Sequence, residues 1–281
     1  MIYEYAIDPA VAARFENLRL IAELFDFSNP RRISRFPKSW LREVYDLSRE
    51  LGDRNQKMVE VKLAQISKEK NCIQKFSREY EPHTNWPENA VNSHQLTPFR
   101  GIICDGAGAA FVASGDVDST HPQLNFSPPF RLEKTVENFM DVLGPVLATA
   151  RELCFVDPYF RPQNRNCSDL FKAIFASLNA RPDASEVYLR VCTFSGESSP
   201  YGTGGEARVI TDMVNNCDLG NLQHKTHVVL CEANMHARYL LTDVGAYVLD
   251  HSFSESRGAI LNISMMSWER AEETKKQYFG A

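Results

Sequence analysis

The chain has 281 residues, a formal net charge of −5 and 24% charged residues, which is typical of a soluble globular protein. No apolar run is long enough to cross a bilayer and no secretory signal opens the chain, so we expect a cytoplasmic protein that does not enter a membrane. The acidic balance excludes a generally basic nucleic-acid coat but allows a local basic groove. The seven cysteines form no Cys-x-x-Cys pair, so we predict neither a structural zinc site nor a disulfide framework.

The first part of the chain is predicted to be mainly helical. A weak strand at 2–7 precedes helices expected over 9–25, 40–51 and 55–76, whose apolar residues recur at the helical period. Residues 81–99 contain Pro82, Pro87 and Pro98 and few periodic apolar positions, which is typical of a connection between two parts. The sequence therefore predicts an N-terminal helical module over 1–95 and a second domain over 96–281.

A basic and aromatic stretch lies between the first two predicted helices. Its cations and its last aromatic residue are Arg31, Arg32, Arg35, Lys38 and Trp40. Cations interleaved with aromatics are typical of single-stranded nucleic-acid binding, with the aromatic ring stacked on a base. The alternative is a loop whose aromatics pack on the core while its cations stay in solvent.

From residue 96 onward, predicted strands and helices alternate. A strand at 100–104 with a hairpin partner at 109–113 comes first. Helices are then expected at 133–150, 168–178, 206–217 and 268–278, and strands at 153–160, 186–194, 226–232, 235–243 and 246–250. This alternation predicts an α/β fold with a mixed sheet flanked by helices.

The predicted strand at 235–243 carries the most reactive residue types of the chain. His236 and Arg238 are two residues apart and therefore project from the same face, and Asp243 follows before a turn. An imidazole can attack phosphorus or transfer a proton near neutral pH, and a guanidinium can bind two phosphate oxygens. A carboxylate can hold an imidazole in the required tautomer. The alternative is a half-buried strand whose polar residues are satisfied locally.

A second polar group ends the apolar run at 153–160. Asp157 follows the buried strand directly, and ligand sites in open α/β sheets lie at such strand ends. Asp157 is therefore a candidate for orienting a catalytic histidine or a substrate group, and its alternative role is to cap the following loop. Arg161 and Arg165 in that loop are candidates for holding phosphate.

The motif His236-x-Arg238-x-x-x-x-Asp243 resembles the signature of the phospholipase D superfamily, with arginine in the position of the family's lysine. The family often has a Gly-Ser pair about seven residues after the aspartate, and this chain keeps only the serine, Ser252, in that region. The resemblance covers the last third to half of the chain. It implies a phospholipase D-like fold and places His236, Arg238, Asp243, Asp157 and Ser252 in the active site.

The resemblance also implies a mechanism without metal or other cofactor. One histidine attacks phosphorus and a second protonates the leaving oxygen. None of the other histidines is followed two residues later by a cation, so the chain carries one copy of the motif. A homodimer would bring two copies together across its axis.

We therefore expect a nuclease that acts on DNA or RNA in a bacterial defence or mobile-element system, alone or within a larger effector complex. Three interpretations stay open: this nuclease, a degenerate member that binds nucleic acid or a partner without cleavage, and an enzyme acting on small phosphodiesters or phospholipids.

Overall fold

The chain divides into two compact units, Ile2–Ser127 and the residues from Pro128 onward. The computed structural model describes residues 2–68, 72–76, 78–106, 111–125, 130–195, 201, 205–231 and 235–280. The division therefore falls about 30 residues later than the expected boundary at 95. The proline-rich stretch that marked that boundary contains a helix of the first unit, α5 (Trp86–Leu96), whose start is capped by Asn85.

The first unit is built on a parallel sheet, which corrects the expected helical module. In the part of the chain that is described, the sheet has the order β3-β2-β1-β4-β5, and every neighbouring pair of these strands is parallel. Its strands are β1 (Tyr3–Ile7), β2 (Arg31–Ser34), β3 (Ile73–Gln74), β4 (Gly101–Ile103) and β5 (Phe111–Val112). Most of these strands are too short to give an alternating pattern, and β4 and β5 are parallel rather than the expected hairpin.

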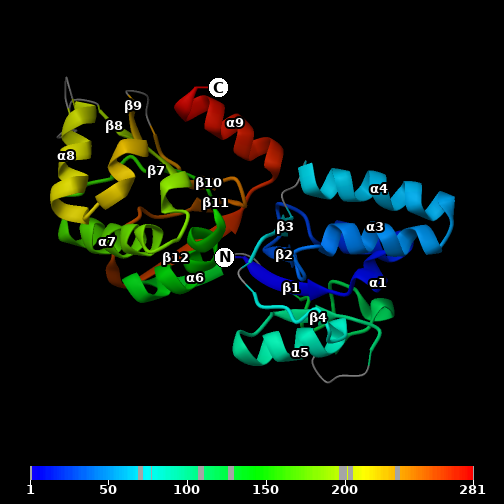
Figure 1. Cartoon of the computed structure of the whole chain (residues 1–281). Coiled ribbons are helices and arrows are strands. Elements are labelled where there is room, and N and C mark those ends of the chain that lie inside the picture. Colours follow the sequence, from blue (N-terminus) through cyan, green and yellow to red (C-terminus); the bar gives the residue numbers. More distant parts are fainter. Residues whose placement is uncertain are drawn as a thin grey trace. The chain divides into compact units, whose positions relative to one another are not determined.

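Helices cover both faces of this sheet. They are α1 (Pro9–Ala12), α2 (Phe15–Leu24), α3 (Trp40–Glu50), α4 (Asp53–Lys68) and α5, with a short 3₁₀ helix η1 (Ser114–Asp116). Tyr5 and Ile7 of β1 pack into the core beneath α1 to α4, whereas Ala6 packs with Trp86 on the face of α5. Figure 1 shows α3 and α4 on one side of β1 and α5 on the other. The sheet is therefore buried on both faces, as parallel sheets usually are.

The second unit is an α/β fold with a mixed sheet flanked by helices, as predicted. The described strands run in the order β6-β12-β11-β10-β7-β8-β9. They are β6 (Phe130–Lys134), β7 (Glu152–Val156), β8 (Tyr188–Phe194), β9 (Thr226–Cys231), β10 (Arg238–Thr242), β11 (Ala246–Leu249) and β12 (Ser256–Met265). β7, β8 and β9 are parallel, and the remaining strands join antiparallel.

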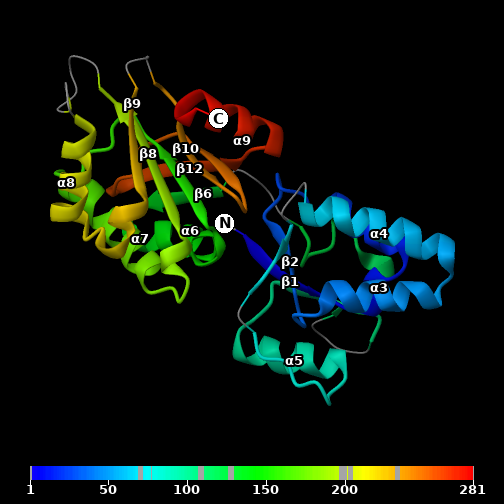
Figure 2. The same ribbon diagram turned by 45° about the horizontal axis from the view of Figure 1, so that its top comes forward.

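The helices of this unit are α6 (Val136–Thr149), α7 (Arg165–Asn179), α8 (Gly205–Cys217) and α9 (Trp268–Phe279), with 3₁₀ helices η2 (Ala184–Glu186) and η3 (Gly220–Lys225). Figures 1 and 2 show α6 and α7 on one face of the sheet and α9 on the other. Among the described helices, none combines the length and the apolar character needed to cross a membrane.

The antiparallel pairing brings several strand ends to one edge of the second sheet. The start of β10 lies beside the end of β7, because Tyr239 pairs with Val156. The end of β11 lies beside the start of β10, and the end of β6 lies beside the start of β12. We call this the motif edge, because His236 and Arg238 lie on it. The opposite edge holds the start of β7 and the end of β10.

Candidate active site

His236 and Arg238 stand at the start of β10 on the motif edge. His236 is exposed and Arg238 is half-buried. One terminal nitrogen of Arg238 donates to the backbone oxygen of His236 at 2.7 Å, and the guanidinium lies 5.1 Å from the ring centre of Tyr159. The Nε atom of Arg238 is buried and has no hydrogen-bond partner among the described residues. Part of the guanidinium is therefore fixed, and part of it still lacks an acceptor.

Asp157 lies beside Arg238, as the pairing of β7 with β10 requires. Its side chain is almost fully buried, with Oδ1 accepting from the backbone N–H of Tyr159 at 2.9 Å and Oδ2 accepting from that of Phe253 at 2.8 Å. Burial raises the pKa of Asp157, although these two bonds, the charge of Arg238 and the Ser252 hydroxyl act in the opposite direction. The carboxyl thus joins the end of β7 to the segment that follows β11.

Ser252 belongs to this group, since it lies next to Phe253 and its hydroxyl interacts with Asp157. Asp250, two residues earlier, accepts from Asn262 of β12 at 2.9 Å through the backbone N–H and at 2.6 Å through the side-chain amide. Burial alone would raise the pKa of Asp250, but the bonds from Asn262 hold it below its ordinary value. The segment after β11 is therefore anchored on both sides.

Lys134, which the sequence did not point to, lies at the same edge. This residue ends β6 and is 5% exposed. Burial lowers the pKa of Lys134, and the charge of Arg238 lowers it further, whereas Asp157 and Asp250 act to raise it. The sequence predicted a helix from residue 133 onward. The alternation of apolar and polar residue types over 130–133 is the period-2 signal of a strand, and it could have predicted β6.

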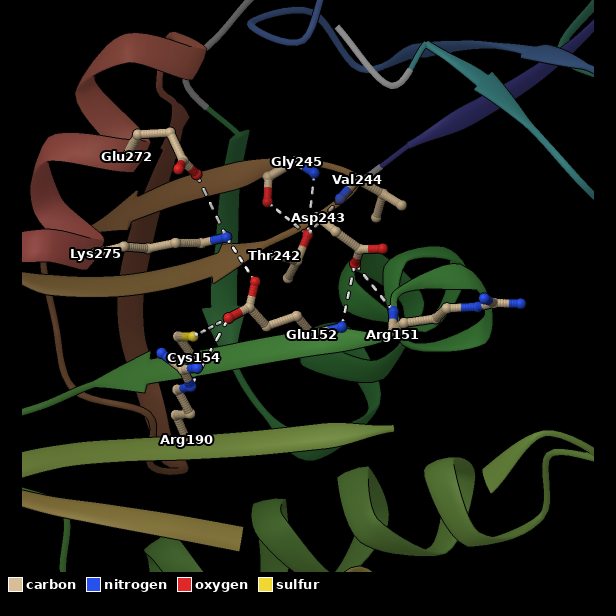
Figure 3. A network of polar contacts seen from close by, with 10 residues as sticks. All are labelled: Arg151, Glu152, Cys154, Arg190, Thr242, Asp243, Val244, Gly245, Glu272 and Lys275. Atoms are coloured by element: carbon tan, nitrogen blue, oxygen red, sulfur yellow. Dashed lines mark hydrogen bonds and ion pairs between the residues drawn. The ribbon is translucent and has the colours of Figure 1, made fainter. Parts of the chain in front are cut away.

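Asp243, in contrast, lies at the opposite edge. It follows the end of β10, and its Oδ1 accepts from the backbone N–H groups of Arg151 at 3.0 Å and Glu152 at 3.2 Å (Figure 3). Five strand residues separate it from the start of β10, a length of about 17 Å. Within one chain, Asp243 therefore cannot orient the imidazole of His236, and this expected role is corrected.

Three members of the basic stretch belong to the core of the first unit and not to a binding surface. Arg31 donates from Nε to Leu124 O at 2.9 Å and from a terminal nitrogen to Leu24 O at 3.0 Å. Arg32 is fully buried and donates to backbone oxygens of the preceding turn. Trp40 is fully buried, with its indole N–H on Ile7 O at 2.6 Å. The prediction that these three residues contact nucleic acid is therefore wrong.

The other two cations of the stretch remain accessible. Arg35 is half-buried and Lys38 is exposed, and both line an open groove of about 630 Å³ that also includes Tyr80. Arg35 donates to the backbone oxygen of Lys38 at 3.2 Å. Because these residues follow β2, the groove lies at the carboxyl edge of the parallel sheet, where ligand sites commonly occur.

Arg161 and Arg165 lie in the segment that leads from Asp157 into α7. Arg161 is half-buried and lies 5.7 Å from the ring centre of Tyr201. Arg165 is exposed and forms an ion pair with Asp169 at 3.3 Å, one turn later in α7. Neither side chain is committed to the core, so both stay candidates for phosphate contact. Across the ranges described, no group of three or more His, Cys, Asp or Glu residues is placed to hold a metal ion.

Comparisons with known proteins give distant likenesses to solved structures. No family model and no curated protein sequence matches the chain. A solved structure similar to it is that of TrmBL2, described as an archaeal chromatin protein with a novel mode of DNA binding. The two are 10% identical with a TM-score of 0.31, and the match covers 54% of this chain and 51% of the other. The match thus spans about half the length of that protein.

Proposed function

We propose that the chain is a metal-independent phosphodiesterase of the phospholipase D-like kind, and specifically a cytoplasmic nuclease, with His236 as its nucleophile. The observation that carries the proposal is the grouping at the motif edge. An exposed imidazole, a guanidinium with an unpartnered buried nitrogen, a buried carboxyl and a serine hydroxyl meet there from β10, β7 and the segment after β11. These groups suit attack on a phosphodiester.

The order of elements also supports the proposal. From β6 to β9, strands and helices alternate, and β10, β11 and β12 then follow without intervening helices. This alternation, with the motif at the start of β10, is the arrangement that a phospholipase D-like repeat implies. The fold of that family is therefore part of the proposal.

In the proposed reaction, the imidazole of His236 attacks phosphorus and a phosphorus–nitrogen bond forms. The bond to the leaving oxygen breaks, and that oxygen takes a proton from a second histidine. Water then attacks the phosphohistidine, gives a proton to the second histidine and releases the imidazole. Arg238 binds the non-bridging oxygens, whose negative charge it neutralises. His236 of a second copy would supply the second histidine, so the active form is a homodimer.

A nucleic-acid substrate is supported by the surroundings of the site. Tyr159 is 56% exposed and lies against the Arg238 guanidinium, where its ring could stack on a base. Arg161 and Arg165 follow in the same segment and would bind neighbouring phosphates. The first unit has its own candidates for contact with nucleic-acid phosphates, Arg35 and Lys38.

The test is cleavage of single- and double-stranded DNA and RNA by the purified protein in excess chelator. The matched variant is His236→Ala with confirmed fold and the same oligomeric state, and His224→Ala, at an exposed position, is the control. We expect cleavage by the wild type and the control and none by His236→Ala. Equal cleavage by all three proteins would overturn the proposal.

One observation favours a second candidate function. Arg238 already uses one nitrogen on the backbone oxygen of His236, and it stands where the family has lysine. A degenerate member would use the same cations to bind nucleic acid without cleaving it. Binding of an oligonucleotide that depends on Arg238, with no cleavage under any condition, would identify that function.

A further inference from the structure

The side chain of Lys134 is almost fully buried, but its ammonium has no bonding partner. The residue is 5% exposed, and its ammonium makes no hydrogen bond or ion pair with the other described residues. The Nζ atom keeps some contact with solvent. A lysine ammonium carries three donors and is strongly hydrated in water. Holding it at a nearly buried position without acceptors costs part of that hydration, so proteins retain such groups where they have a use.

The neighbouring carboxylates do not supply that partner. Asp157 accepts from two backbone N–H groups, and Asp250 accepts from Asn262 twice. Both act on Lys134 through their charge alone, and neither lies within ion-pair distance of it. The carboxylates therefore balance the charge of Lys134 without satisfying its donors.

Arg238 is a second cation with an unsatisfied donor at the same edge. Its charge acts on Lys134, and its Nε is buried without an acceptor. Two cations that approach one another with unsatisfied donors are stabilised by an anion that accepts from both. The two side chains come from β6 and β10, which are separated in the sheet by β12 and β11. Such an anion would therefore connect the end of β6 to the start of β10 at the motif edge.

We propose that Lys134 is a second phosphate-binding residue of this site, which supplies the ammonium that the motif lacks at position 238. The inference deepens the proposed function, because the anion would be the phosphodiester that His236 attacks. In this arrangement the lysine comes from β6, about 100 residues before the motif, and Arg238 supplies the planar guanidinium.

The test is binding of inorganic phosphate at low ionic strength, measured by calorimetry on the full chain. Lys134→Met keeps the length of the side chain and removes the charge, and Lys276→Met removes an exposed charge of α9 as the matched control. Loss of one charged hydrogen-bonding group weakens binding by about 10- to 100-fold. We expect that loss for Lys134→Met and unchanged binding for Lys276→Met.

A stability measurement separates a ligand role from a purely structural one. Without phosphate, Lys134→Met should unfold at no lower a temperature than the wild type, because a charge without acceptors is gone from a nearly buried position. With phosphate, only the wild type and the control should gain stability. If the methionine variant does not fold, Lys134→Gln takes its place in both measurements.

Failure of this inference and failure of the proposed function give different results. The binding experiment is repeated with His236→Ala, which cannot form the phosphohistidine. Phosphate binding that depends on Lys134, together with a wild-type protein that cleaves no nucleic acid, would support the inference and reject the catalytic proposal. Equal phosphate affinity of Lys134→Met and Lys276→Met would overturn the inference, whether or not the wild type cleaves nucleic acid.

Discussion

A carboxyl group lies at each end of β7 with cations nearby, but only the carboxyl at the start of the strand forms ion pairs. At the start of the strand, Glu152 accepts from Lys275 of α9 at 2.8 Å and lies 3.8 Å from Arg190 of β8 (Figure 3). At the end of the strand, Asp157 is buried beside two cations, and no ion pair of 4.0 Å or less joins it to another described residue. At the start of β7 the opposite charges are paired with one another, and we call this the saturated end. At the end of β7 the carboxyl is held by hydrogen bonds alone and the cations beside it have no ion-pair partner among the described residues, and we call this the unsaturated end.

Under the proposed function, the saturated end serves the fold and the unsaturated end serves the substrate. The pair of Glu152 and Lys275 joins α9 to the sheet and leaves little capacity for a further group. A groove of about 540 Å³ opens at this end, but Arg151 on its wall pairs with Glu186 at 3.2 Å and Arg190 pairs with Glu152. Concavity alone therefore does not mark the site, and at the other end of β7 Arg238 keeps a buried donor without an acceptor.

The largest expected effect comes from substituting Arg238 at the unsaturated end of β7. Arg238→Gln should lower kcat/KM by about 100- to 1,000-fold, as loss of a donor that stabilises developing charge commonly does. Arg238→Lys restores the residue of the family motif and should stay within about tenfold of the wild type. Steady-state cleavage of an oligonucleotide in chelator measures both.

Arg270→Gln, at an exposed position of α9, is the control for the loss of one positive charge. If Arg238→Gln and Arg270→Gln cleave equally well, the guanidinium at the motif edge is not part of the active site. The buried Nε of Arg238, which has no acceptor, would then need another explanation.

How far the sequence predicts this molecule depends on which residues form its strands. The apolar runs of β7 and β8 were predicted because these strands are largely buried. β9, an edge strand that is mostly half-buried, was predicted from its apolar residues, and the motif strand from its residue types. β6 and β12 were missed because exposed polar residues alternate through them and Gly258 interrupts β12. Lys134 was therefore missed together with its strand.

Other predictions failed because they needed contacts distant in sequence. Arg31 and Arg32 looked like solvent-facing cations, but the carbonyl groups that accept from them, such as Leu124 O, could not be located from the sequence. Asp243 looked like a partner of His236 because the motif places them in one short segment. Strand geometry separates them, since the chain advances by about 3.3 Å per residue.

A smaller effect is expected from the saturated end at Glu152. Burial alone would raise the pKa of Glu152, but the bond from Lys275 and the charges of Lys275 and Arg190 hold it below 4.5, its ordinary value. A carboxyl whose pKa is lower in the folded state stabilises the fold above its unfolded pKa and loses that contribution as the pH falls through the folded pKa. Glu152→Gln should therefore lower the free energy of unfolding by about 1 kcal/mol at pH 7.

The pair of Glu152 and Lys275 also sets the upper limit of the pH range in which it stabilises the fold. Burial alone would lower the pKa of Lys275, but the bond to Glu152 raises it above 10.5, its ordinary value, so the contribution persists until the pH rises through that higher value. Urea unfolding should show a difference between wild type and Glu152→Gln at pH 7 that shrinks as the pH falls below 4.5. Glu269→Gln, at an exposed position, is the control, and a difference independent of pH would exclude the ion pair as the cause.

The smallest effect is expected at Asp243, and it tests the comparison most directly. Both backbone N–H groups bond to the same oxygen, Oδ1, which an asparagine side chain can replace. Asp243→Asn should therefore cost only about 0.5–1 kcal/mol of unfolding free energy and leave cleavage within about twofold of the wild type. If Asp243→Asn instead abolishes cleavage while its fold and oligomeric state are unchanged, the motif aspartate acts in the reaction. In that case the two backbone N–H groups bound to Asp243 would not argue against a catalytic role for it. The contrast between the two ends of β7 would then not distinguish structural from functional residues.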